Sequence, residues 1–331
     1  MNAVVVMGAS AGGVVALTEI LAGIPADFPA PILVVMHIGD HPSMLPVLLA
    51  RRCALSVRHA GHHETLGPGM VLIAPPDLHL LVERHEGALR TVLARGPKEN
   101  HSRPAIDTLF RSAAAACGDA AAGVILTGYL DDGVAGLQAI KACGGTAIVQ
   151  DPAEASVPDM PRHAIDQVDV DFCVPLDGIA GVLVEWAGLP RAVADERTEV
   201  PQWLQVENRF ATGDGEMHQL KYIATPSPYS CPECGGTLFS VNNTRPCRFR
   251  CHTGHSFTLL ALLQQQEAVI EASLSAALRA VQEKENLAEQ LAAEFSARSL
   301  TPEPGYATLA QRARAEAEAL RALLAGGGIV D

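Results

Sequence analysis

The chain has 331 residues and a formal net charge of −13, with 48% hydrophobic and 18% charged residues. This composition excludes a disordered or fibrous protein and suffices for roughly two folded domains. The negative charge disfavours a binder of nucleic acid or of membrane surfaces, because clustered Lys and Arg side chains bind phosphate groups. No apolar run reaches the ~18 residues of a membrane-spanning helix, and no basic segment precedes the first apolar stretch as in a signal peptide. We therefore expect a cytoplasmic protein without membrane insertion.

The first half of the chain alternates apolar runs with helical patterns. The apolar runs cover residues 3–7, 32–36, 70–74, 78–82, 124–126 and 146–149. The helical patterns cover residues 14–22, 42–52, 105–117, 134–142 and 178–186. This alternation predicts an α/β fold with a doubly wound, mainly parallel sheet and helices on both faces. The turn residues 75–77 further predict a hairpin between the runs at 70–74 and 78–82.

The second half reads as three segments after a first domain at residues 1–187. Residues 188–228 are irregular and polar, and we interpret them as a linker with a short strand around residues 204–210. A Cys/His-rich, zinc-ribbon-like module follows at residues 229–257. Residues 258–325 show the apolar spacing of two helices. Their apolar stripe must be buried in an intramolecular hairpin, against the first domain, or in a homodimer through these C-terminal helices.

Ser10 follows the first apolar run, within the sequence GASAGG at residues 8–13. It lies where a helix should begin, and the free amides and dipole of a helix N-terminus favour a developing oxyanion. Gly12 and Gly13 would allow a substrate backbone to approach closely. Two other interpretations stay open here: Ser is a common helix N-cap, and a Gly-rich turn also suits the phosphates of a dinucleotide.

A histidine and a carboxylate follow two further predicted strands. A dinucleotide fold would place an acidic residue at the end of the second strand, where this chain has His37 and only later Asp40. Asp131 and Asp132 follow the buried run at residues 124–126. Because the carboxyl ends of parallel strands share one edge of the sheet, these side chains can meet Ser10 there. A carboxylate that orients a histidine base beside a serine defines a hydrolase triad, which geometry rather than chain order identifies.

Six ordered motifs together resemble the CheB family of chemotaxis protein-glutamate methylesterases over nearly all of residues 1–185. They are GASAGG (8–13), VVMHIGD (34–40), GMVLIAPPDLHLLV (69–82), SRPAIDTLF (102–110), LTGYLDDG (126–133) and QDPAEASVPDMPRHAI (150–165). The resemblance implies a serine hydrolase that removes methyl groups from glutamate γ-methyl esters through an acyl-enzyme, without a cofactor for catalysis. Its partner would be a methylated chemoreceptor-like protein, and glutamine deamidation would be a parallel side activity.

The resemblance also implies roles for single residues. It makes Ser10 the nucleophile, His37 the base and Asp132 the orienting acid, since Asp132 rather than Asp131 directly precedes the Gly of the family's DG element. The backbone N–H groups of Tyr129 and Ala11 would bind the oxyanion.

Arg103 would lie at the rim of the family's site and recognise acidic residues around the substrate glutamate, or else anchor a loop. Family members often have Thr where this chain has Ala11, and Met-Gly where it has Tyr129 and Leu130. The well-known members carry a receiver domain ahead of the esterase. Here the first strand begins at residue 3, so we expect no control by phosphorylation of a receiver domain in this chain.

Two functions of other classes remain as alternatives. One is a catalytically silent module of the same fold that binds receptors as a scaffold, against which the intact triad argues. The other is a dinucleotide-binding protein. Labelling by a serine-reactive phosphonate and an NAD(P) titration separate these alternatives from an esterase.

The Cys/His-rich module has metal-site spacing. Cys231 and Cys234 form a Cys-x-x-Cys followed by two glycines, and Cys251 and His255 are separated by three residues. We predict a structural, tetrahedral zinc on these four residues, with Cys247 and His252 as alternative ligands and a metal-free thiol module as the other possibility. Some receiver-less relatives carry a similar CPxCGG…FRCxxGH tail. Four protein ligands would close the site to catalysis.

Overall fold

The computed structural model describes residues 3–37, 43–189, 199–242, 244–297 and 305–326. The chain divides into two compact units, Met1–Leu262 and Leu263–Asp331. In the part of the chain that is described, no helix is both long and apolar enough to cross a membrane.

The core of the first unit is a seven-stranded sheet in the order β3-β4-β2-β1-β7-β8-β9. All neighbouring strands pair in parallel, which confirms the predicted doubly wound α/β class. The central strands are apolar without interruption because helices cover both of their faces. The bounds are β1 Val4–Ala9, β2 Ile32–Met36, β3 Ser56–His59, β4 Met70–Ile73, β7 Ala121–Ile125, β8 Thr146–Gln150 and β9 Phe172–Val174.

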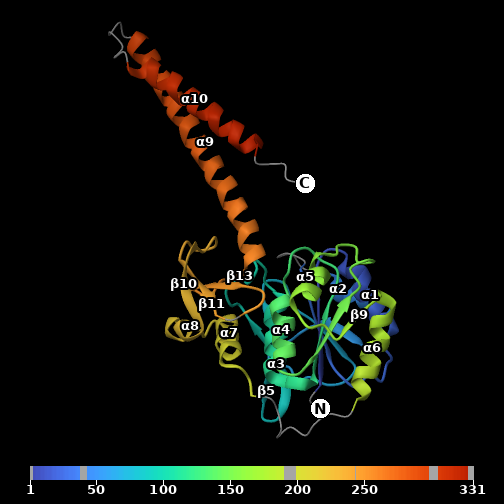
Figure 1. The fold of residues 1–331 in the computed structure, drawn as a ribbon. Helices are drawn as coiled ribbons and strands as arrows, with labels where there is room; N and C mark the ends of the chain where they lie inside the picture. Colours follow the sequence, from blue (N-terminus) through green and yellow to red (C-terminus); the bar gives the residue numbers. More distant parts are fainter. Residues whose placement is uncertain (1–2, 38–42, 190–198, 243, 298–304, 327–331) are drawn as a thin grey trace. The chain divides into compact units, whose positions relative to one another are not determined.

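Two helical layers bury the faces of this sheet (Figure 1). Along β1, Val4 and Val6 point to one layer and Val5 and Met7 to the other, as the two-residue period of a strand requires. One layer consists of α3 Ile106–Cys117, α4 Val134–Ala142 and α5 Asp159–Gln167. The other consists of α1 Gly13–Gly23, α2 Leu45–Ala50 and α6 Leu176–Gly188.

The hairpin predicted at residues 70–82 is wrong. The strand β4 joins the main sheet, and β5 (His79–His85) pairs instead with β6 (Ala88–Ala94). The turn that joins β5 to β6 has positive φ at Glu86 (49°) and Gly87 (82°). Two consecutive positive φ angles are the conformation that a two-residue hairpin turn requires. The hairpin therefore forms at Glu86 and Gly87 and not at the Pro-rich turn before β5.

The stretch interpreted as a linker contains regular structure, although residues 190–198 of it lie outside the described part. Helix α7 (Gln202–Thr212) replaces the strand expected at residues 204–210, so that prediction is wrong. Leu204, Glu207 and Phe210 are all buried, at a spacing of three residues that fits one helical face. Helix α8 (Met217–Ile223) follows, with a capping box between Glu216 and Gln219.

The Cys/His-rich module is a four-stranded antiparallel sheet in the order β10-β11-β12-β13. Its strands are β10 Ala224–Ser230, β11 Thr237–Val241, β12 Arg248–Cys251 and β13 Ser256–Thr258. This module belongs to the first compact unit, together with the large sheet.

The two predicted C-terminal helices are present as α9 (Leu259–Ala297) and α10 (Gly305–Gly326). Small side chains fill the contact between them: Ala288, Ala310, Ala313 and Ala317 are buried. Arg314 of α10 adds ion pairs at 2.7 Å to Glu285 and Glu289 of α9. The helices therefore bury part of their apolar stripe against each other.

Candidate active site and Cys/His cluster

Ser10 lies in the tight turn between β1 and α1. Its backbone N–H donates to Thr127 O (3.0 Å), and its carbonyl accepts from Gly13 N (2.9 Å). The N-cap of α1 is Gly12, at φ 81°, so Ser10 is not a capping residue. The hydroxyl of Ser10 is consequently free of the structural task that a serine at a helix start usually performs.

The two glycines after Ser10 and Ala11 meet close packing. A Cβ on Gly12 would lie 2.8 Å from Cβ of Ser156, and one on Gly13 would lie 2.7 Å from Cβ of Ala9. Backbone conformation and packing thus require both glycines. Their predicted role in substrate approach stays a prediction.

His37 directly follows β2, next to Ser10. The last register pair of β1 and β2 joins Ala9 to Met36, and the N–H of His37 donates to Ala9 O (3.3 Å). The backbones of Ser10 and His37 therefore leave adjacent strands at the same edge of the sheet. The His37 side chain is 21% exposed, so a ligand arriving at this edge can reach it. Asp40 lies outside the described residues.

Asp132 holds the imidazole of His37, whose Nε2 lies 2.9 Å from Asp132 Oδ2. The carboxylate also accepts hydrogen bonds from Ile106 N (2.7 Å), Asp107 N (3.3 Å) and Asn100 Nδ2 (3.0 Å). It thus sits at the N-terminus of α3, where free amides stabilise negative charge. Burial opposes ionisation, but the hydrogen bond and charge of His37, with the other donors, outweigh it and lower the pKa of Asp132.

The two neighbouring carboxyl groups differ from Asp132. Asp131 accepts a hydrogen bond from Thr258 Oγ1 (2.7 Å), and burial raises its pKa. Burial and then the charge of Asp132 raise the pKa of Asp107 to about 8. The two pKa values shift in opposite directions, so Asp132 is the more acidic member of the pair, and it is the one that contacts His37.

The loop after β7 closes the site against Ser10. A Cβ on Gly128 would lie 2.7 Å from Cβ of Ser10 and 2.2 Å from Sδ of Met160, so only glycine fits there. Among the hydrogen bonds of the described residues, the backbone N–H groups of Ala11 and Tyr129 are not donors. The predicted oxyanion site requires donors that are not used elsewhere, so this role of the two amides stays a prediction.

Arg103 is engaged in a loop contact. Its Nε and Nη2 donate to Asp77 Oδ1 (2.8 and 2.6 Å), and its Nη1 donates to Gly96 O (2.8 Å). The Arg103 side chain is 16% exposed. This arrangement favours the loop-anchoring alternative, and a contact of Arg103 with acidic substrate residues stays a prediction.

Sequence reasoning did not single out Asn100, Gly128 or Thr258. Gly128 could have been found, because it stands inside the motif LTGYLDDG. Asn100 and Thr258 are 158 residues apart, and no spacing indicates that they meet.

The four predicted metal ligands lie together. One ligand atom from each of Cys231, Cys234, Cys251 and His255 lies within 4.8 Å of all the others. Cys234 Sγ is 3.8 Å from Cys251 Sγ, and His255 Nδ1 is 3.5 Å from Cys251 Sγ. Zinc bonds of ~2.3 Å to sulfur in a tetrahedron place two sulfurs about 3.8 Å apart, so the donor set fits this metal.

Neither alternative ligand belongs to the cluster. Cys247 is exposed, and the His252 ring packs over Gly236, where an added Cβ would lie 2.3 Å from its Cε1. All eight cysteines of the chain are free thiols.

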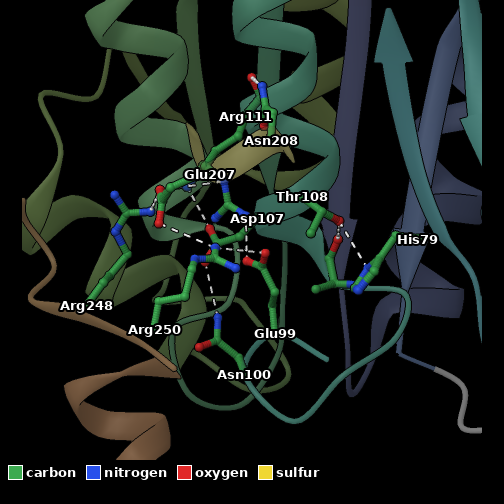
Figure 2. Close-up of polar contacts among 12 residues, drawn as sticks. His79, Glu99, Asn100, Asp107, Thr108, Arg111, Glu207, Asn208, Arg248 and Arg250 are labelled. Carbon is green, nitrogen blue, oxygen red and sulfur yellow. Dashed lines mark hydrogen bonds and ion pairs between the residues drawn. The ribbon is translucent and has the colours of Figure 1, made fainter. Parts of the chain in front are cut away.

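A buried ion network joins the large sheet domain to α7 and the Cys/His module (Figure 2). Arg111 of α3 binds Glu99 (2.5 Å), and Arg250 of β12 binds Glu99 (3.0 Å) and Glu207 (3.4 Å). Arg248 of β12 also pairs with Glu207. All five side chains are at most 1% exposed, so the module is attached through the protein interior.

A serine at the end of β1 and a partly buried His–Asp pair at the same carboxyl edge of the parallel sheet are elements from which a serine hydrolase is built. A family model described as CheB methylesterase matches residues 5–183, and the chain belongs to this family.

A relative from Leptospira interrogans, provisionally named a protein-glutamate methylesterase/protein-glutamine glutaminase, is 40% identical over 181 residues, 54% of this chain and 92% of the relative. Protein-glutamate methylesterase/protein-glutamine glutaminase 2 of Anaeromyxobacter dehalogenans is 44% identical over 183 residues, 55% of this chain and 52% of the relative. The crystal structure of the Thermotoga maritima CheB methylesterase catalytic domain is similar, with a TM-score of 0.55 and 35% identity. The similarity covers 56% of this chain and 98% of that domain.

Proposed function

We propose that this protein is a protein-glutamate methylesterase that uses Ser10, His37 and Asp132 as its triad. The observation that carries the proposal is the 2.9 Å contact between His37 Nε2 and Asp132 Oδ2. It lies at the same edge of the sheet as Ser10, which directly follows β1. Membership of the CheB methylesterase family supports the reaction class. His37 rather than an acidic residue directly follows β2, which weakens the dinucleotide alternative.

The proposed reaction is acyl transfer. Because Nε2 of His37 is bound to Asp132, Nδ1 is the nitrogen left to accept the Ser10 proton. The Ser10 oxygen attacks the γ-carbonyl of a glutamate methyl ester, and the N–H groups of Ala11 and Tyr129 bind the oxyanion. His37 then returns the proton to the departing methanol. Water, activated by the same imidazole, hydrolyses the acyl-enzyme to glutamate and regenerates Ser10.

Asp132 orients His37 and stabilises its protonated form during this cycle. Its lowered pKa means that it stays ionised while His37 carries a proton, which stabilises the imidazolium. Glutamine deamidation would follow the same steps with ammonia as the leaving group, and we propose it as a side activity because amides are the poorer acyl donors. The proposed partner is a methylated chemoreceptor-like protein. We also propose a cytoplasmic location, which is supported by the grouping of three cysteines with a histidine as possible metal ligands rather than in disulfides.

We also propose that Cys231, Cys234, Cys251 and His255 hold a structural zinc. Their mutual distances support tetrahedral coordination, and four protein ligands leave no position for a reacting water. When bound, the metal would supply a crosslink that stabilises the fold of the module, and the reaction steps do not pass through it. A homodimer through α9 and α10 stays a prediction.

Methanol release from methylated receptor fragments tests the proposed function, with wild type compared against Ser10→Ala. We expect release by wild type and at least about a 10³-fold loss in the variant, since a triad without its nucleophile retains little activity. Ser275→Ala, on the exposed surface of α9, is the matched control and should behave as wild type. A serine-reactive phosphonate should label wild type but not Ser10→Ala. Unlabelled wild type that still binds methylated fragments would favour the silent scaffold instead.

A further inference from the structure

We propose that β13 of the Cys/His module is part of the esterase site, where Asn100 acts as a positioning residue for Asp132. The inference rests on the proposed function, because it assigns a means of orienting the acid of that triad. It extends the site to residues 256–258, well beyond the end of the family match at residue 183.

The strand β13 is joined to the segment before α3 by backbone hydrogen bonds. Asn100 N donates to Ser256 O (2.8 Å), and Ser256 N donates to Lys98 O (3.3 Å). Glu99 and Ser256 form a parallel bridge. The ion pair between Arg250 and Glu99 fastens the same segment from β12, next to β13. The position of Asn100 is therefore defined by the module as well as by the large sheet domain.

The hydrogen bonds of Asn100 allow only one of the two orientations of its side-chain amide. Its Oδ1 accepts a hydrogen bond from Thr258 N (2.9 Å), while its Nδ2 donates to Asp132 Oδ1 (3.0 Å) and Asp107 Oδ2 (3.1 Å). A backbone N–H can only donate, so Thr258 fixes the amide oxygen on its own side. The amide nitrogen then faces the carboxyl groups, and Figure 2 shows Asn100 pointing toward Asp107. A rotated amide would turn its oxygen to charged Asp132, which repels it.

Thr258 makes a second contact with the same loop. Its Oγ1 donates to Asp131 Oδ1 at 2.7 Å, and Asp131 is 2% exposed. Because Asp131 immediately precedes Asp132, this hydrogen bond holds the backbone that carries the acid. The strand β13 thus restrains Asp132 on two sides: through the amide of Asn100 and through the loop at Asp131.

The test compares matched variants at two positions. Asn100 has φ 47°, a value that glycine and Asp tolerate, so Asn100→Gly removes the side chain and Asn100→Asp keeps its shape but loses the donor. Thr258→Val loses the hydroxyl at nearly constant volume, whereas Thr258→Ser keeps it. Thr237→Val, on the exposed side of β11, is the control. The readouts are kcat and KM for methanol release and the rate of Ser10 labelling by a phosphonate.

We expect Asn100→Gly to lose about 10- to 100-fold in kcat and in labelling rate, the effect of one hydrogen bond to a charged group, with KM little changed. Asn100→Asp should lose at least as much, because its carboxyl oxygen also repels Asp132. Thr258→Val should lose about 3- to 10-fold, the effect of a neutral hydrogen bond, and Thr258→Ser should regain most of it. A merely structural role would leave kcat of the folded variants intact. Folding is checked by circular dichroism, and Asn100→Asp serves if Asn100→Gly does not fold.

The outcomes separate the proposed role of β13 from the proposed methylesterase function. Wild-type labelling rates in folded Asn100 and Thr258 variants would overturn this inference alone. Wild type that is labelled at Ser10 but releases no methanol would overturn the proposed substrate, while the labelling rates still decide the role of β13. Wild type that is not labelled at all would overturn both.

Discussion

Replacing Glu207 by Gln should strongly destabilise the first unit of the protein. Glu207 is completely buried on α7 and, with Glu99, faces three buried guanidinium groups: Arg111, Arg248 and Arg250. These five side chains already carry one more positive than negative charge. The substitution preserves the shape of Glu207 and removes one of the two anions.

The expected cost follows from the loss of this charge in the interior. Breaking a buried ion pair from one side typically costs about 3–5 kcal/mol, because the remaining charge is left without compensation. Within the described residues, five guanidinium nitrogens of these arginines already lack a hydrogen-bond partner, so donors are in excess and the loss of a carboxylate acceptor is hard to compensate. A domain is usually stable by about 5–15 kcal/mol, and the loss is a large share of it.

The measurement is urea unfolding at pH 7, followed by circular dichroism, with the free energy of unfolding taken by linear extrapolation. Glu185→Gln, on the exposed side of α6, is the control and should change this free energy by less than about 0.5 kcal/mol. A loss below about 1 kcal/mol for Glu207→Gln would refute the reasoning. It would mean that α7 is no more than a tether, as the polar composition of residues 188–228 first indicated.

Three further predictions follow from other parts of the structure. Gly128→Ala should lower both the melting temperature and the rate of phosphonate labelling, since the new Cβ would lie 2.7 Å from that of Ser10; labelling at the wild-type rate would contradict this. Removal of metal by a chelator should lower the melting temperature of wild type but not of Cys251→Ser, which has already lost a ligand; equal responses would argue against the site. The third concerns acid. Burial opposes ionisation of Glu99, but the charges of Arg111 and Arg250 lower its pKa to about 2. Its contribution is therefore complete above the unfolded pKa of about 4.3 and is lost as pH falls toward 2, and Glu99→Gln should flatten this part of the stability profile.

The parts of the fold that the sequence predicts are those governed by local chemistry. The central strands are buried on both faces, so residues 3–7 and 32–36 read as unbroken apolar runs. Convergence of strand ends predicts that His37 meets Asp131 or Asp132 at one edge of the sheet, and only the family's DG element distinguishes Asp132, which contacts His37. Cys231 and Cys234 lie close together because a Cys-x-x-Cys turn is a local structure.

The parts that escaped prediction depend on distant segments. Helix α7 buries Glu207, a charged side chain, which pattern reading assigns to the surface; its partners Arg248 and Arg250 follow about forty residues later. The hydrogen bond between Asn100 and Thr258 spans 158 residues. Such contacts are specified by tertiary packing, so neither periodicity nor motif spacing indicates them.

The strand order has a consequence for heat inactivation. Ser10, His37 and Asp132 follow β1, β2 and β7, which adjoin one another at the middle of the sheet, with two more strands on either side. Partial opening of a protein begins at its periphery, and the interior strands separate only in global unfolding. Fraying of β3 or β9 would therefore leave the strands that carry the proposed triad residues in place. On heating, opening of the edges of this sheet should not by itself remove the capacity to react before the central strands separate.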